Sequence, residues 1–189
     1  IPSHKPGDYF TRCLESLDAQ DLDVSLYKVY IALNGPQHPY EDFILETLSK
    51  TSFNYQYFHI ETSGVSNARN LLIADSTEKY LVFVDDDDKV SKNFLRTLYL
   101  LRHPNSIVAS NVQSFSIEDP ISPNYVGKFI DKTRKTNFKN LYESRKLLSS
   151  ATAKLFPRSI LTDVQFDTSL KVGEDSYFMA CLAPSIINI

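Results

Sequence analysis

Four consecutive aspartates, Asp85 to Asp88, follow directly after the apolar run 80–84. Carboxylates only a few ångströms apart repel one another by about 1 kcal/mol in water and by several kcal/mol in a partly buried cleft. A hard divalent cation such as Mg²⁺ or Mn²⁺ would offset this repulsion, because it takes oxygen ligands and commonly combines one or two carboxylates with substrate phosphates. A solvated acidic loop, with Asp88 acting only as a cap, is the alternative.

The segments around the aspartates alternate between strand-like and helix-like patterns. The expected helices have apolar residues at i, i+3, i+4 and i+7, and the expected strands are rich in aromatic and β-branched residues. Repeated strand–helix units over residues 1–110 predict an α/β fold with a mostly parallel sheet. We expect strands at residues 26–33, 54–60, 80–84 and 106–110, after the end of a first strand at Ile1 and Pro2, and helices at residues 10–17, 40–50, 64–76 and 94–101.

The alternation stops after Ser110. Residues 119–140 are polar and carry several Lys and Arg side chains, and they predict a long loop. Such a loop would cover a diphosphate or an anionic acceptor, or it would simply be solvated. Further helices are expected at residues 138–148 and 174–183.

The aspartates are expected at the ligand-binding edge of the sheet, because ligands of open α/β sheets bind at the carboxyl ends of the strands. In an extended backbone, Asp85 and Asp87 would face one side of the strand and Asp86 the other. Two kinds of site use this pattern. One is a cation that holds a diphosphate. The other is a phosphatase of the haloacid-dehalogenase type, with Asp85 as nucleophile and Asp87 as acid/base. Lys89, where that family has Thr or Val, counts against the second.

Length and composition limit the class of protein. The chain has 189 residues and a net charge of −3, which fits one domain and argues against a broad nucleic-acid-binding surface. Its two cysteines, Cys13 and Cys181, are too few for a disulfide framework and fit a reducing compartment. No apolar stretch reaches the about 20 residues of a transmembrane helix, and no signal peptide is visible. The chain opens within a strand, so we expect truncation at one or both ends.

Three stretches resemble, in order, landmarks of family-2 glycosyltransferases with the GT-A fold. They are "IPSHKPGDYFTRCLESLDAQ", "TSGVSNARNLLIADSTEKYLVFVDDDD" and "FDTSLKVGEDSYFMACL". The resemblance implies a single Rossmann-like GT-A catalytic domain over residues 1–189, with a central, mostly parallel sheet flanked by helices. Residues 1–110 would form the nucleotide-sugar-binding half, and residues 111–189 would form the acceptor-side half.

The resemblance also implies a nucleotide-sugar donor, a divalent cation and roles for particular residues. The DxD-type pair is Asp85 and Asp87, and both are expected at the metal, with Asp87 as the main ligand. Arg69, in the "ARN" motif, is expected to pair with Asp85 or a phosphate oxygen. Asn34 stands where the family often has an Asp that reads the base. The residues expected at the nucleotide are Pro2, Ser3, His4, Asn34, Arg69, Asp85 and Asp86.

A late acidic pair, Glu174 and Asp175, resembles the catalytic-base position of the family. A sugar hydroxyl is a poor nucleophile, and a carboxylate that accepts its proton accelerates attack by about 10²- to 10⁴-fold. Asp175 would be that base, and Glu174 would position it or the acceptor. The alternative is that these two acids have no catalytic role and occur there only because negative charge is stabilised at the N-terminus of a helix. Lys154 and Arg158 are further acceptor-side candidates.

The function implied is a metal-dependent, inverting transfer of a sugar from a nucleoside-diphosphate sugar, with UDP expected, to a hydroxyl acceptor. The acceptor would be a saccharide or a lipid-linked saccharide, in the synthesis of a surface polysaccharide or glycolipid. We expect a cytoplasmic enzyme, with peripheral association at the inner face of the membrane, and no nucleic-acid partner. A non-catalytic domain that binds nucleotide or carbohydrate is an alternative. A nucleotidyltransferase is another, although "SHKPGDY" lacks the Gly-rich loop typical of that class.

Overall fold

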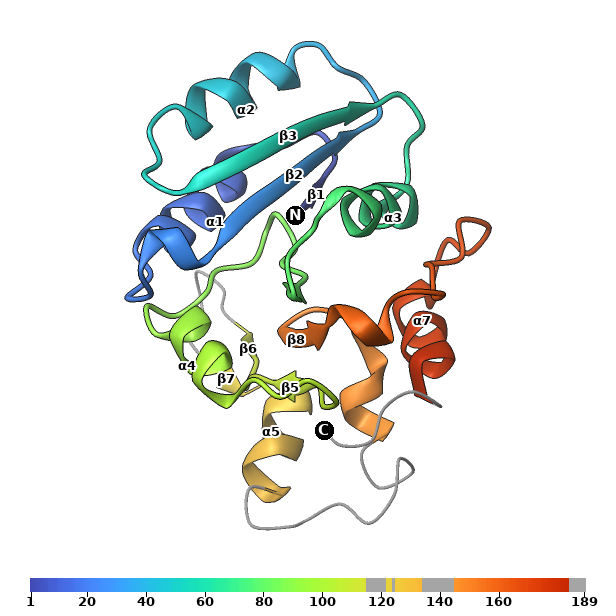
Figure 1. The fold of residues 1–189 in the computed structure, drawn as a ribbon. Coiled ribbons are helices and arrows are strands. Elements are labelled where there is room, and N and C mark those ends of the chain that lie inside the picture. Colours follow the sequence, from blue (N-terminus) through green and yellow to red (C-terminus); the bar gives the residue numbers. More distant parts are fainter. Residues whose placement is uncertain (115–121, 124, 134–144, 184–189) are drawn as a thin grey trace.

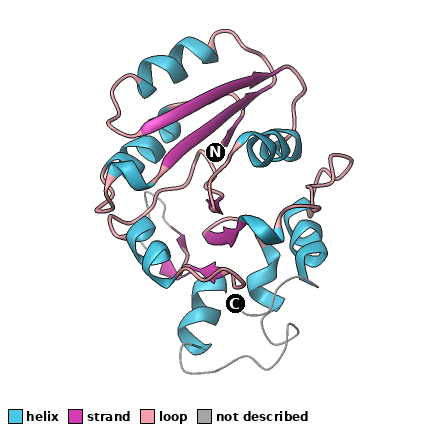
Figure 2. Ribbon diagram, in the orientation of Figure 1, coloured by secondary structure: helices cyan, strands magenta, loops and turns pink. Residues whose placement is uncertain are grey.

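The computed structural model describes residues 1–114, 122–123, 125–133 and 145–183. In these residues a parallel sheet and an antiparallel sheet carry helices around them (Figure 1, with the elements coloured by type in Figure 2). The α/β class predicted from the sequence is therefore confirmed. The loop expected over residues 119–140 is wrong where this stretch is described, because it contains β7 (Ser122–Pro123) and the helix α5 (Tyr125–Thr133). Of the helix expected at 138–148, residues 145–148 belong to the 3-10 helix η2 (Arg145–Ser149), and the rest lies outside the described residues.

The first sheet contains three parallel strands in the order β1–β2–β3 (Pro2–Ser3, Lys28–Asn34 and Asn54–Ile60). In this register, Ala32 of β2 lies opposite Pro2 of β1 and Phe58 of β3. Parallel neighbours need a crossover connection, and here the connections run through α1 and α2 (Asp8–Asp18 and Tyr40–Leu48). The carboxyl ends of β1, β2 and β3 therefore lie at one edge.

Helices cover both faces of β2. Ile31 and Leu33 are fully buried in a cluster with side chains of α1 and α2. Ala32 points the other way and packs with Ala68 and Leu72 of α3 (Val65–Asp75). Since alternate side chains of a strand face opposite sides, the near-continuous burial along β2 follows from this double cover. The small Ala68 lets α3 approach the sheet closely.

The second sheet is antiparallel and differs from the mostly parallel arrangement expected for this part of the chain. Its order is β4–β8–β5 (Tyr80–Val82, Lys154–Pro157 and Val108–Ala109). β8 lies between the other two strands and runs opposite to both. β8 is only a four-residue run that ends in a proline, so its sequence does not mark it as a central strand.

Four phenylalanines form the core beneath this second sheet. The rings of Phe166 and Phe178 stack with their centroids 3.8 Å apart, and Phe83 meets Phe156 edge-on at 5.6 Å. Phe178 belongs to α7 (Glu174–Leu182), the helix predicted at the end of the chain. Burial of several aromatic rings supplies much of the local driving force for folding, and it fixes α7 against the end of β4.

The remaining described elements are peripheral to the site. They are η1 (Val24–Leu26), α4 (Phe94–Leu101), β6 (Gln113–Ser114), β7 (Ser122–Pro123), α5 (Tyr125–Thr133), η2 (Arg145–Ser149) and η3 (Arg158–Ile160). None of the helices in the described part of the chain has the length and apolar character that crossing a membrane requires.

Candidate active site

The aspartate run lies directly beyond the end of β4 and forms a turn rather than an extended strand. The N–H of Asp88 donates to the carbonyl oxygen of Asp85 at 3.1 Å, which closes the turn. Asp85 and Asp86 are half-buried, whereas Asp87 and Asp88 are exposed. The expected alternation of facing sides is wrong because the backbone is not extended here: Asp85, Asp86 and Asp87 all line one hollow.

This hollow has a volume of about 460 Å³ and lies at the carboxyl ends of β1, β2 and β4. A second hollow of similar volume lies against β2 and β4, but its lining is mainly apolar and contains none of the four aspartates. The polar hollow is therefore the candidate site. It brings together most of the residues predicted to act: Pro2, Ser3, His4, Asn34, Arg69, Asp85, Asp86, Asp87 and Glu174.

Electrostatic strain is built into the acidic turn. Partial burial of the Asp88 carboxyl group, together with the nearby carboxylates of Asp85, Asp87 and Asp86, raises the pKa of Asp88 to about 6. Burial also raises the pKa of Asp86, although the hydroxyl of Ser3 opposes this by donating to Asp86 Oδ2 at 2.5 Å. The carboxylates thus repel one another in the folded protein, as expected from the sequence, and a bound cation would relieve that repulsion.

Asn34 joins the ends of β1 and β2 to the start of α3. Its Nδ2 donates to the carbonyl oxygen of Ser3 at 2.7 Å, and its Oδ1 accepts the N–H of Gly64 at 2.9 Å. Gly64 has a φ of 136°, a conformation that only glycine adopts readily, and it starts α3 as predicted. Asn34 is 3% exposed, so its amide has a structural task, and its reading of the base stays a prediction.

His4 has an exposed ring at the mouth of the hollow. Its Nδ1 lies 2.6 Å from the carbonyl oxygen of Asn34. A carbonyl oxygen can only accept, so Nδ1 carries the proton. Gly35 lies beneath this ring with a φ of 101°, and a Cβ there would come within 2.8 Å of His4 Cε1 and 2.7 Å of Ser63 Oγ. A glycine is therefore required where β2 meets the hollow.

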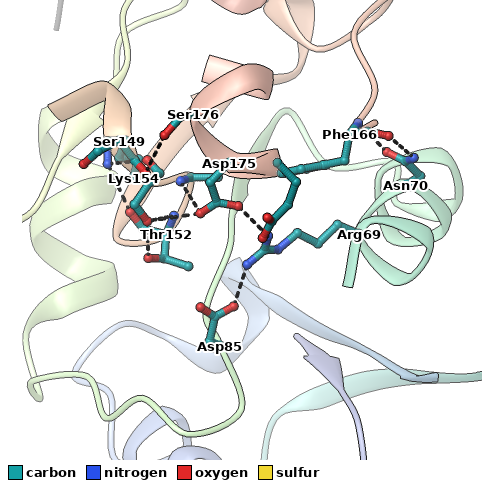
Figure 3. Close-up of polar contacts among 12 residues, drawn as sticks. Arg69, Asn70, Asp85, Ser149, Thr152, Lys154, Phe166, Asp175 and Ser176 are labelled. Carbon is teal, nitrogen blue, oxygen red and sulfur yellow. Dashed lines mark hydrogen bonds and ion pairs between the residues drawn. The ribbon is translucent and has the colours of Figure 1, made fainter. Parts of the chain in front are cut away.

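Arg69 is the centre of the site. Its side chain is 3% exposed, and its Nη2 donates to Asp85 Oδ1 at 2.8 Å while its Nη1 donates to Asp175 Oδ1 at 2.5 Å (Figure 3). Nη1 also lies 3.9 Å from Glu174 Oε1. The guanidinium carbon lies 5.1 Å from the centroid of the Phe166 ring, a cation–π contact. The predicted Arg69–Asp85 pair is thus present, and the same arginine reaches the predicted base.

Asp175 lies in the first turn of α7, where Gly173 with a φ of 83° precedes the helix. Its Oδ1 accepts from Arg69, and its Oδ2 accepts the N–H of Ala151 at 2.9 Å and the hydroxyl of Ser150 at 3.3 Å. A carboxylate has about four acceptor positions. Three are therefore in use, and one on Oδ1 is left for a further hydrogen.

Asn70, next to Arg69, forms two hydrogen bonds to the backbone of Phe166. Its Nδ2 donates to the carbonyl oxygen at 2.9 Å, and its Oδ1 accepts the N–H at 2.8 Å (Figure 3). α3 therefore contacts the second half of the molecule through two consecutive side chains.

Lys154 and Arg158 do not face an acceptor space. Lys154 is 3% exposed and lies behind the loop that holds Asp175. Arg158 donates to the carbonyl oxygen of Glu78 and to the hydroxyl of Ser76, both at 2.7 Å, and so ties β8 to the end of α3. Sequence reasoning missed the Ser150–Ala151 contact with Asp175, because one of its two donors is a backbone N–H that no residue type announces.

The site combines the edge of a parallel sheet, a polar hollow with clustered carboxylates and an acid pair at the start of α7. In a family comparison, the model of glycosyl transferase family 2 matches residues 1–164. The chain belongs to this family. The predicted family and its GT-A fold are confirmed.

Two curated relatives show the extent of the match. The chain is 27% identical to glycosyltransferase GlyA of Streptococcus pneumoniae, covering 94% of this chain and 26% of that protein. It is 23% identical to the minor teichoic acid biosynthesis protein GgaB of Bacillus subtilis, covering 93% of this chain and 20% of that protein. The chain therefore spans about a quarter of the length of the relatives it matches.

Solved structures share the fold. The crystal structure of Staphylococcus aureus TarS 1-349 in complex with UDP-GlcNAc superposes with a TM-score of 0.78 at 20% identity, covering 100% of this chain and 54% of that one. The mannosyltransferase PcManGT of Pyrobaculum calidifontis, in complex with GDP-Man and Mn²⁺, gives a TM-score of 0.71 at 14% identity, covering 100% of this chain and 52% of that one.

Proposed function

We propose that this protein is a metal-dependent, inverting glycosyltransferase that moves a sugar from a nucleoside-diphosphate sugar, with UDP as the expected nucleotide, to a hydroxyl acceptor. The observation that carries this proposal is the double ion pair of Arg69. Asp85 is 16 residues away from Arg69 and Asp175 is 106 residues away, yet one guanidinium contacts both. One guanidinium thereby links a carboxylate that lines the hollow, Asp85, to the candidate base Asp175, whose neighbour Glu174 also lines the hollow.

The nucleotide would bind at the ends of β1 and β2. Pro2, Ser3 and His4 line that end of the hollow, and the exposed ring of His4 can stack on a base. Asn34 lies between them and α3, while Asp86 is positioned by Ser3 to accept a ribose hydroxyl. UDP is favoured because the similar TarS structure was solved with UDP-GlcNAc.

The carboxylates of the hollow fit a divalent cation whose other ligands are phosphate oxygens and water. In the described part of the chain, no group of three or more His, Cys, Asp or Glu side chains could hold a metal. Mg²⁺ and Mn²⁺ do not need such a cage, because they bind one or two carboxylates together with phosphate oxygens and water. Asp87 is exposed at the hollow and would be the main ligand, with Asp85 as the second. The cation would neutralise the departing diphosphate.

Asp175 is suited to act as general base. The acceptor hydroxyl would give its proton to the remaining acceptor position on Asp175 Oδ1, while its oxygen forms the new bond to the anomeric carbon. The bond between that carbon and the diphosphate breaks, and its electron pair leaves with the nucleoside diphosphate. Glu174 lines the hollow and would orient the acceptor. Attack opposite the leaving group inverts the anomeric configuration.

The two halves of the chain would divide this work. Residues 1–110 hold the donor, and residues 111–189 provide the base and the acceptor side. We propose a saccharide or lipid-linked saccharide acceptor in surface-polymer synthesis. This follows the names of two relatives: GgaB is a minor teichoic acid biosynthesis protein, and TarS is a poly(ribitol-phosphate) β-N-acetylglucosaminyltransferase. The reaction would then take place in the cytoplasm at the inner face of the membrane.

The phosphatase alternative is disfavoured by Arg69. A nucleophilic Asp85 must be free to attack phosphorus, but its Oδ1 is engaged at 2.8 Å by the guanidinium. The family match over residues 1–164 also points away from it and from a nucleotidyltransferase.

A screen of nucleotide sugars tests the proposal. UDP with Mn²⁺ at about 100 times its dissociation constant should stabilise the folded protein by about 2.7 kcal/mol in a thermal unfolding experiment. At least one UDP-sugar should be hydrolysed more slowly when the metal is chelated. Absence of stabilisation by every nucleoside diphosphate with Mn²⁺ or Mg²⁺ would contradict the proposal. Binding without any hydrolysis or transfer would instead support the non-catalytic binding domain.

A further inference from the structure

A lysine is buried directly behind the candidate base. Lys154, the first residue of β8, is 3% exposed. Burial lowers the pKa of its ammonium group to about 8, and the nearby Asp175 carboxylate opposes part of this decrease. A buried ammonium carries a desolvation penalty, so its retention needs an explanation.

The ammonium of Lys154 holds a short turn, residues 150–152, in place. Its Nζ donates to the carbonyl oxygen of Ser150 at 2.7 Å and to that of Thr152 at 3.3 Å (Figure 3). Ser150 Oγ in turn accepts the N–H of Thr152 at 3.1 Å. Ala153, between the turn and β8, has a φ of 56°, which costs a non-glycine residue about 1–2 kcal/mol. The surrounding contacts therefore impose the shape of this turn.

The held turn presents its donors to Asp175. The N–H of Ala151 and the hydroxyl of Ser150 contact Oδ2, while Arg69 contacts Oδ1. The carboxylate is thus held at Oδ1 by the side chain of Arg69 and at Oδ2 by the turn. If the turn moved, the plane of the carboxylate would rotate, and its remaining acceptor position would point elsewhere.

We infer that Lys154 is a positioning residue for the base. Its ammonium fixes the turn 150–152, and the turn fixes the carboxylate of Asp175 so that Oδ1 can receive the proton of the acceptor hydroxyl. This inference rests on the proposed function, in which Asp175 is the base. Lys154 itself would contact neither donor nor acceptor.

A neutral side chain of similar length could not do this. Methionine would fill the space, but it would leave the carbonyl oxygens of Ser150 and Thr152 without the donor they now share, and unpaired buried groups are costly. Arginine would restore both the charge and the donors. Lys154→Met and Lys154→Arg therefore separate the electrostatic and hydrogen-bonding role from the filling of space.

The experiment measures hydrolysis of UDP-N-acetylglucosamine with Mn²⁺ as a function of pH, together with the affinity for UDP with Mn²⁺. If another UDP-sugar is the better donor in the screen, that sugar replaces it. Lys154→Met should lower kcat by about 10- to 100-fold, since a misplaced catalytic group loses that much. It should also move the acid limb of the pH–rate profile to higher pH. The affinity for UDP should stay within about twofold of wild type, because the nucleotide side is untouched.

Two further variants complete the test. Lys154→Arg should recover most of kcat and return the acid limb toward the wild-type position. The matched control is Lys28→Met, which removes a partly buried lysine at the start of β2 whose Nζ donates to Gln56 Oε1 at 2.6 Å. Lys28→Met should leave both kcat and the pH profile unchanged. If Lys154→Met does not fold, Ser150→Ala removes a donor to Asp175 from the same turn and should produce the same shift of the acid limb.

The outcomes separate this inference from the proposed function. Unchanged kcat and an unchanged acid limb in Lys154→Met would overturn the positioning role. A loss of thermal stability with an unmoved acid limb would also overturn it, because Lys154 would then serve the fold alone. If the wild-type protein neither binds UDP with Mn²⁺ nor hydrolyses any nucleotide sugar, the proposed function fails first and the inference fails with it.

Discussion

The two sheets place their site residues in different ways. On the parallel side, Ser3 and Asn34 end β1 and β2, Gly64 follows β3, and hydrogen bonds join the three residues at one edge. On the antiparallel side, the contacts connect distant parts of the chain: Arg69 and Asp175 are 106 residues apart, and Asn70 and Phe166 are 96 residues apart.

This difference indicates which contacts of the site a single substitution would disturb most. The polar edge proposed to bind the donor is a property of the parallel topology, so many contacts share the task of holding it. The candidate base depends on a few long-range contacts that converge on one carboxylate. Single substitutions should therefore disturb the antiparallel side more than the parallel side.

Among the substitutions that test this comparison, replacing Arg69 should have the largest effect. Arg69→Met leaves Asp85, Glu174 and Asp175 close together without their cation, and removing one partner of a buried ion pair typically costs about 3–5 kcal/mol. The free energy of unfolding, measured with urea, should fall by that amount.

The control for Arg69 is an arginine in an exposed pair. Arg96 Nε lies 3.1 Å from Asp21 Oδ2, and the Arg96 side chain is 54% exposed. Arg96→Met should cost less than about 1 kcal/mol, as surface ion pairs do. If both substitutions have equally small effects, the convergence on Arg69 does not hold the halves together.

Replacing the candidate base Asp175 should impair catalysis without impairing nucleotide binding. Asp175→Asn should lower the rate of sugar transfer or hydrolysis by about 10²- to 10⁴-fold, since the amide cannot accept the proton. Affinity for UDP with Mn²⁺, measured by calorimetry, should change little because the donor edge is intact. Asp163→Asn, at an exposed position, is the control and should keep the wild-type rate. Equal activity in both variants would remove Asp175 from its role.

Replacing one aspartate of the run should act on the donor side alone. Asp87→Asn should abolish most of the about 2.7 kcal/mol by which Mn²⁺ and saturating UDP stabilise the wild-type protein. Asp88→Asn, one residue further and also exposed, should retain it. Differential scanning fluorimetry measures both. Full stabilisation of Asp87→Asn by Mn²⁺ with UDP would show that the metal binds elsewhere.

The smallest expected effect is a pH dependence of stability from Lys154. Its pKa is lowered from 10.5 to about 8 by burial, so above about pH 8 the folded state binds fewer protons than the unfolded state. Stability contributed by this site therefore rises with pH. The difference in unfolding free energy between wild type and Lys154→Met should shift in favour of wild type by about 1–2 kcal/mol between about pH 8 and 9.5. A difference that is flat with pH would contradict the buried, charged state.

The sequence predicted which residues meet at the polar edge of the parallel sheet because its signals are local. A buried run followed by Asp85, Asp86 and Asp87 indicates the end of a strand, and Gly64 indicates a tight helix start. The pairing of Arg69 with Asp85 could be inferred because the two residues belong to adjacent elements.

The second half of the chain was predicted less completely for a physical reason. β8 pairs antiparallel between β4 and β5, and such non-local pairing leaves no periodic pattern in a four-residue strand. Lys154, expected on the acceptor side, is instead buried, and the sequence could not show this because burial of a charge depends on what surrounds it in space. The N–H of Ala151 is a backbone group, so its contact with Asp175 has no residue-type signal.

Arg69 and Asn70 also have a mechanical consequence. They are consecutive residues of α3, a helix packed against the parallel sheet, and each is attached to the other half of the molecule. The distance between Asp85 and Asp175 is bridged by one planar guanidinium, whose two terminal nitrogens each contact one carboxylate. That flat group is a spacer of fixed width, so the gap across the site is set by covalent geometry and resists stretching as long as both carboxylates stay attached to it.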